Sequence, residues 1–137
     1  MERQILLLRA SYWVGAIIDA IVGFAMIYPP FFALMEGFDT FTPGSDYVFA
    51  MGIGAPLMFG WTILLLWGDR KPVERKGILL ITIIPVITGI YLNRLYGLAS
   101  GFVTFEGSLI SLIVPIILVI LFLGSYLYSV RTDSGIL

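Results

Sequence analysis

The chain has 137 residues, of which 59% are hydrophobic and 12% are charged, and its net charge is −1. A soluble domain carries about 25% charged residues, and a chain of this length has too little interior to hide so much apolar surface, so the excess faces lipid. Cysteine and histidine are absent. This excludes disulfides and removes the usual metal and haem ligands and the default general base. We expect no cofactor, no metal site and, at this net charge, no nucleic-acid partner.

Four stretches are apolar enough and long enough to cross a bilayer, which takes about 20 residues. They run over about 5–28, 47–67, 77–96 and 108–128. A cleaved signal peptide is a poor description of the first, because the stretch is too long, contains Asp19 and lacks a small-x-small cleavage site. The pattern predicts an all-α, polytopic membrane protein, with residues 1–137 forming one four-helix transmembrane domain in contact with the lipid bilayer.

The basic residues predict the orientation of these helices. Seven of the eight Lys and Arg residues fall on the side that holds both termini and the 68–76 loop, and Arg94 alone falls on the other. Because basic residues collect on the cytoplasmic side, we expect both termini in the cytoplasm. The expected location is the plasma membrane, with multiple passes.

The longest connection, residues 31–46, is unusually apolar for a linker. A short interfacial helix that covers the outer end of the bundle is one interpretation. An ordered loop packed on the helix ends is the other, and the sequence leaves both open.

Small and polar residues recur at spacings of three and four along one face of each span. In a membrane, small residues let helix backbones approach closely, and hydroxyls and amides bond across the interface. We expect these faces to point into the bundle or toward another subunit, and for the glycines and serines packing alone is the more common explanation. The four sets are Tyr12, Gly15, Ala16, Asp19, Gly23 and Met26; Gly52, Pro56 and Gly60; Thr82, Pro85, Gly89, Asn93 and Tyr96; and Ser108, Ser111, Pro115, Ser125 and Ser129.

Asp19 lies near the middle of the first span, where a carboxylate costs roughly 2.5–3.5 kcal/mol. The group must have a partner or stay protonated, and in either case an acid at this depth indicates function. Prolines inside helices free backbone carbonyls, and three of them fall at the depth of Asp19, although prolines are also common in such helices. The candidate midplane binding site is Asp19, Gly15, Gly23, Pro56, Pro85, Thr88, Asn93, Arg94 and Pro115.

Arg94, at the outer end of the third span, has two candidate partners. Its long side chain can turn inward toward Asp19, or it can pair with Glu106 at the start of the fourth span. Because Arg94 and Glu106 lie at the same depth, the sequence favours an outer ion pair between them.

These features favour a small transporter or channel subunit with a midplane acid. The layout resembles the small multidrug resistance exporters, which also have four helices and an acid in the first. The resemblance is architectural: those proteins are shorter and use a glutamate, and no motif carries a residue over. A pathway would form more easily between subunits of a homo-oligomer, for a small-molecule or lipid ligand.

Two other classes remain open. A membrane enzyme acting on a lipid or isoprenoid could use Asp19, Glu106 and tyrosines as acids and bases, although no catalytic constellation assembles and we lean against an enzyme. An accessory subunit of a larger membrane complex would instead pair Asp19 with a basic residue of its partner.

Overall fold

The computed structural model describes residues 2–38 and 40–135, and over these residues the regular structure is helical throughout, with no strand. Four helical segments are long and apolar enough to cross a membrane, as the sequence predicted. Three of them are single α-helices, and the third span consists of α4, a π-helical turn and α5 in direct succession. The elements are α1 (Glu2–Ile27), α2 (Pro29–Glu36), α3 (Ser45–Asp69), α4 (Gly77–Ile81), η1 (Thr82–Ile87), α5 (Thr88–Ala99) and α6 (Leu109–Asp133).

The break between α1 and α2 follows from two consecutive prolines. Tyr28 adopts an extended backbone, with φ −115° and ψ 91°, directly before Pro29. A residue that precedes proline is disfavoured in helical geometry, while proline itself fits the first turn of a helix. Helix α2 therefore begins at once, and it ends at Gly37 in the left-handed conformation, with φ 71°. Of the two interpretations of residues 31–46, the structure has the short helix.

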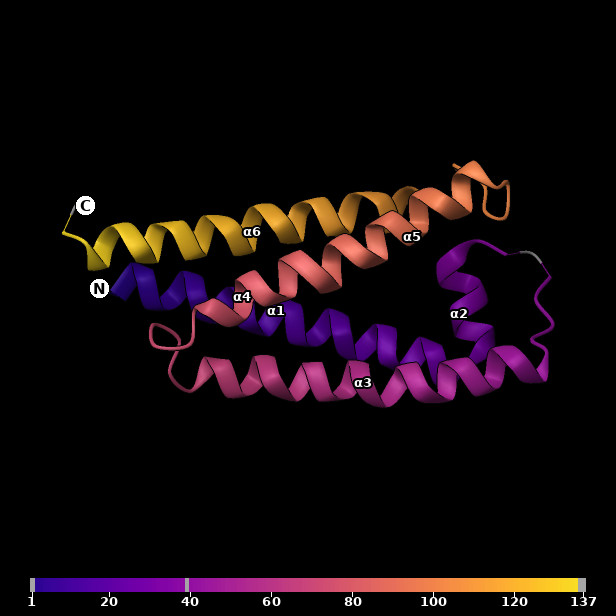
Figure 1. Cartoon of the computed structure of the whole chain (residues 1–137), viewed down its shortest axis with the longest axis horizontal. Coiled ribbons are helices and arrows are strands. Elements are labelled where there is room, and N and C mark those ends of the chain that lie inside the picture. Colours follow the sequence, from indigo (N-terminus) through magenta and orange to yellow (C-terminus); the bar gives the residue numbers. More distant parts are fainter. Residues whose placement is uncertain (1, 39, 136–137) are drawn as a thin grey trace.

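Helix α1 lies along α3 on one side and along α6 on the other, and the third span lies along α6 (Figure 1). The start of α1 and the end of α6 lie at the same end of the molecule, which we call the termini end. Helix α2 crosses the opposite end, which we call the α2 end. The turn between α3 and α4 returns the chain at the termini end.

The core is built where α1 meets these neighbours. Leu8 and Tyr12 of α1, Leu65 of α3, Leu79 of α4 and Phe122 of α6 are fully buried. The outward faces are apolar as well. Each of the four spans has large exposed apolar side chains, as contact with lipid requires. Examples are Leu6 (69% exposed), Ile63 (67%), Ile84 (67%) and Ile110 (74%).

The three helix-interior prolines have different local consequences. Pro85 lies inside the π-helical turn η1, where the hydroxyl of Thr88 donates to the carbonyl of Ile83 at 2.9 Å. The same carbonyl also accepts from the backbone N–H of Thr88, so Thr88 closes the turn through both its backbone and its side chain. Pro56 and Pro115 lie within α3 and α6, which continue through them.

Candidate functional site

Asp19 lies on the buried face of α1, between Gly15 and Gly23 at the four-residue spacing that puts all three on one side of the helix. Its residue surface is 8% exposed. The Oδ2 atom is buried and has no hydrogen-bond partner among the residues that the structure describes. Buried carboxylates are normally paired or hydrogen-bonded, so an acid left in this state is an exception that calls for an explanation.

Each glycine beside Asp19 is covered by a phenylalanine ring from another helix. A methyl group on Gly15 would lie 2.8 Å from Cζ of Phe122, which belongs to α6. A methyl group on Gly23 would lie 3.2 Å from Cε1 of Phe59, which belongs to α3. Asp19 therefore lies between two aromatic contacts, one a helical turn toward the termini end and the other a turn toward the α2 end.

The antiparallel packing of α1 and α3 explains why Asp19 has no partner among the described residues. Gly15 contacts Leu65 and Gly23 contacts Met58, so the α3 residues between these contacts lie at the level of Asp19. The polar members of that segment use their donors elsewhere. Trp61 donates from Nε1 to Oγ1 of Thr82 at 3.1 Å, and Thr62 donates to the carbonyl of Met58 at 3.0 Å.

Toward the termini end, polar groups continue along the contact between α1 and α6. The hydroxyls of Ser11 and Ser125 lie 2.8 Å apart, and both are within hydrogen-bond distance of the Leu7 carbonyl, at 3.0 and 3.3 Å. Both serines are buried. Together with Gln4 and Ser129 nearer the end of the molecule, they form what we call the polar seam.

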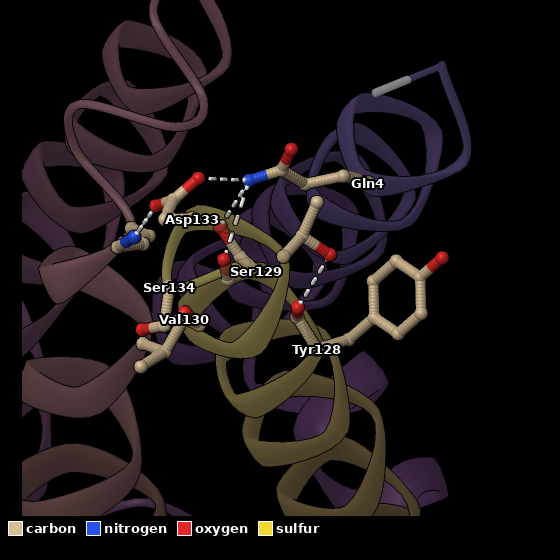
Figure 2. A network of polar contacts seen from close by, with 8 residues as sticks. Gln4, Tyr128, Ser129, Val130, Asp133 and Ser134 are labelled. Carbon is tan, nitrogen blue, oxygen red and sulfur yellow. Dashed lines mark hydrogen bonds and ion pairs between the residues drawn. The ribbon is translucent and has the colours of Figure 1, made fainter. Parts of the chain in front are cut away.

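Figure 2 shows the part of the polar seam that lies nearest the termini end. The amide nitrogen of Gln4 donates to Oγ of Ser129 and to Oδ1 of Asp133, both at 2.8 Å. The other carboxylate oxygen of Asp133 pairs with Lys76, which precedes α4. This network joins α1, α6 and the start of the third span.

A separate polar contact joins α1 to α3 at the same end. Arg9 pairs with Asp69 at 2.9 Å, and Nε1 of Trp13 donates to the same carboxylate at 3.2 Å. Arg75 stacks on the ring of Trp67, with Cζ 3.4 Å from the ring centroid. The basic residues of the termini end are thus partly engaged in holding helix ends together.

At the α2 end, the ion pair differs from the one predicted. Arg94 pairs with Glu36, and both side chains are almost fully buried, at 13% and 12% exposure. Arg94 forms no ion pair with Glu106 among the described residues, so the expected Arg94–Glu106 pair is wrong, and Glu106 is exposed. The physical reason is the position of α2: its last turn packs on the loop before α6, and a methyl group on Gly37 would lie 2.7 Å from Cα of Gly107.

Aromatic side chains pack together at the α2 end, where this ion pair lies. The ring of Phe38 packs on Phe41 and on Phe102, with centroids 5.5 and 5.6 Å apart. Phe32 of α2 packs on Tyr47 at the start of α3 at 5.5 Å. The α2 end is therefore covered by aromatic contacts together with one buried ion pair.

The structure does not gather the other predicted residues around Asp19. Pro56, Pro85, Thr88 and Asn93 are exposed on the outward faces of their helices, and Pro115 is half-buried. The expected midplane cavity lined by all of them is therefore not formed within one chain. A different space, a groove of about 220 Å³ between the third span and α6, includes two of them: its lining is Ile87, Thr88, Tyr91, Leu92, Pro115, Ile116 and Val119.

Sequence reasoning missed Phe122, Phe59 and Glu36. Nothing in the local pattern marks the two phenylalanines, because an apolar ring in an apolar helix carries no signal until its neighbour is known. Glu36 lies at the same end of the molecule as Arg94, and its pairing depends on how α2 turns back over the helix ends.

This arrangement can bind a proton or a small cation, since a buried carboxylate without a partner gains most from such a charge. Among residues 2–38 and 40–135, no group of three or more acidic, His or Cys side chains could hold a metal ion. The chain belongs to the class of all-helical proteins whose helices can cross a membrane. No known family model, curated protein or solved structure matches it.

Proposed function

We propose that this protein is a small multi-pass carrier that binds a proton or a cationic solute at Asp19. The observation that carries the proposal is the buried carboxylate whose Oδ2 has no partner among the described residues. An ionisable group inside a membrane helix is expensive to keep, and such groups mark ion or proton pathways. The two phenylalanine contacts support a site that is closed from both ends in this conformation.

The proposed orientation places the termini end in the cytoplasm. That end carries seven of the eight basic residues, including the four in the turn between α3 and α4. Short loops rich in Lys and Arg stay on the cytoplasmic side. We place the protein in the plasma membrane, with the α2 end facing out.

A two-sided mechanism fits the distribution of polar contacts. The polar seam and the Asp133–Lys76 pair hold the helices together at the termini end, and the Glu36–Arg94 pair holds them at the α2 end. Opening one set of contacts while the other stays closed would expose Asp19 to one side at a time. The proposal is that binding at Asp19 changes which set is closed.

The outward faces of α3 and the third span support a homo-oligomer. Gly52 and Gly60 on α3 and Gly89 on the third span have open space where a side chain would be. Asn93 is also exposed there, and an amide facing lipid lacks hydrogen-bond partners. A second copy packed on these faces would bury the glycines and bond the amide.

The competing classes fit less well. An accessory role that pairs Asp19 with a partner's basic residue requires an outward carboxylate, whereas Asp19 faces the core. An enzyme requires an assembled set of reacting groups, and Asp19 and Glu106 are on separate elements, one buried and the other exposed.

The test compares the wild-type protein with Asp19→Asn and with Glu106→Gln in proteoliposomes. The fluxes measured are those of protons, sodium and tetraphenylphosphonium, a lipophilic cation. We expect at least one flux above that of empty vesicles, lost in Asp19→Asn and retained in Glu106→Gln, which neutralises an exposed carboxylate. Equal fluxes in wild-type protein and Asp19→Asn would rule out the proposed role of Asp19.

A further inference from the structure

Polar side chains are unequally distributed on the two sides of Asp19. Toward the termini end, the polar seam continues inward as far as Ser11 and Ser125. Toward the α2 end, residues 20–27 of α1 and 48–60 of α3 include no polar side chain. On that side α6 contributes Ser111, whose hydroxyl donates to the carbonyl of Ser108 in its own helix at 3.0 Å.

We infer that Asp19 exchanges its proton with the compartment at the termini end, through the polar seam, and that the Phe122 ring is the barrier between them. The inference rests on the proposed function and on its orientation, which makes that compartment the cytoplasm. In this exchange a proton joins or leaves one carboxylate oxygen, and no other bond changes.

The geometry identifies Phe122 as the barrier. Ser11 precedes Asp19 by eight residues, or about 12 Å along the helix. The position between them on this face is Gly15, which has no side chain, so the ring of Phe122 and the end of Leu65 fill the space. Phe122 is fully buried. A proton needs hydroxyls or water to move, and this apolar contact separates Asp19 from the innermost hydroxyls of the polar seam, Ser11 and Ser125.

Other charges are too far along the helices to control Asp19. No hydrogen bond or ion pair joins Asp19 to another described residue, and the charged residues of the packed helices lie near the helix ends. The titratable groups on these helices are Glu2, Arg3, Arg9 and Tyr12 in α1; Asp46, Tyr47 and Asp69 in α3; Tyr126, Tyr128, Arg131 and Asp133 in α6; and Tyr91, Arg94 and Tyr96 in the third span.

The test measures on which side the pH controls protonation of Asp19. The whole protein is reconstituted in vesicles with one verified orientation, and the pH is set separately on the two sides. The probe is dicyclohexylcarbodiimide, which crosses the membrane and adds to a protonated carboxyl group. The adduct at Asp19 is measured by mass spectrometry, with Asp19→Asn as the blank. We expect acidification at the termini end to increase labelling, and acidification at the α2 end to leave it unchanged.

Two matched pairs of variants test the route. Phe122→Ala should speed the response to acid at the termini end about tenfold, equivalent to about 1.4 kcal/mol of activation free energy. Phe59→Ala, which removes the ring on the other side of Asp19, should not. The double variant Ser11→Ala with Ser125→Ala should lose the response, whereas Ser111→Ala should keep it. If Phe122→Ala does not fold, Phe122→Leu keeps more of the volume and tests the same step.

The inference is overturned if labelling follows the pH at the α2 end, follows both sides equally, or is absent at every pH. It is also overturned if Phe59→Ala, and not Phe122→Ala, speeds the response. Labelling requires no transport. A chain labelled from the termini end whose fluxes do not depend on Asp19 would therefore retain this inference and lose the proposed function.

Discussion

The ring of Phe122 lies directly over Gly15, so close that a single methyl group on the glycine would be 2.8 Å from its Cζ atom. Two residues that are more than a hundred positions apart in sequence are thus in tight contact. Phe122 is fully buried, so neighbouring side chains enclose the ring. The contact explains why the first span has glycine at this position despite the poor helix propensity of glycine.

Gly15→Ala should therefore destabilise the protein, by about 1–3 kcal/mol for overpacking, less about 1 kcal/mol gained in helix propensity. The measurement is the free energy of unfolding in detergent micelles. Gly89→Ala is the matched control, since nothing lies within 4 Å of its added methyl group. It should leave the monomer unchanged or slightly more stable. Equal effects of the two substitutions would show that the Phe122 contact does not limit the packing.

The ion pair at the α2 end provides a second prediction. Arg94→Gln or Glu36→Gln should destabilise the protein by about 3–5 kcal/mol, because either change leaves one charge of a nearly buried pair without its partner. Glu106→Gln should have little effect, since Glu106 is exposed. The measurement is the thermal unfolding of the three variants and the wild-type protein in the same detergent. A larger loss in Glu106→Gln than in Glu36→Gln would instead support the pair favoured by the sequence.

That ion pair shows where sequence reasoning ends. The number of long helices and the two interior glycines beside Asp19 follow from hydropathy and helical spacing, which are local properties. Arg94 and Glu106 were matched by depth, which is also a local estimate. Glu36 competes because α2 turns back across the helix ends, and the angle of that turn depends on Gly37 packing against Gly107, seventy residues further along the chain.

The exposed prolines Pro56 and Pro85 also show that local sequence properties do not determine which residues meet at the candidate site. Pro56 and Pro85 were assigned to the depth of Asp19, and depth says nothing about which way a residue faces. The rotation of each helix is set by its contacts. On α3 the packing face carries Ala55 and Met58, so Pro56 is turned outward. The acid itself was found from sequence because its cost in a membrane is independent of its neighbours.

The part of the polar seam nearest the termini end provides a third prediction. Gln4→Ala removes a buried amide that donates to Ser129 and Asp133, so it should destabilise the protein by about 1–3 kcal/mol. Lys71→Ala is the control, because its pair with Glu74 is well exposed and should be worth less than about 1 kcal/mol. Unfolding by denaturant, followed by tryptophan fluorescence, measures both. If the two variants lose the same free energy of unfolding, the network of Figure 2 contributes no more stability than an exposed ion pair.

The last prediction separates a functional acid from a structural one. Replacing a residue that is kept for function at a cost in stability makes the protein more stable, whereas replacing a residue that is kept for packing makes it less stable. Asp19→Asn preserves the volume and removes the charge. At a pH where the carboxyl group is ionised, we expect a gain of up to about 2.5–3.5 kcal/mol in the free energy of unfolding, which is the insertion cost of an intramembrane carboxylate.

Ser125→Ala is the comparison for that gain. Its hydroxyl is also buried, in the contact between α1 and α6, but it is hydrogen-bonded, so its removal should cost about 0.5–1.5 kcal/mol. Opposite signs for the two variants are therefore expected in the same unfolding experiment. A loss of stability in Asp19→Asn would mean that the carboxylate holds the helices together, and Asp19 would then be a structural residue and not a carrier site.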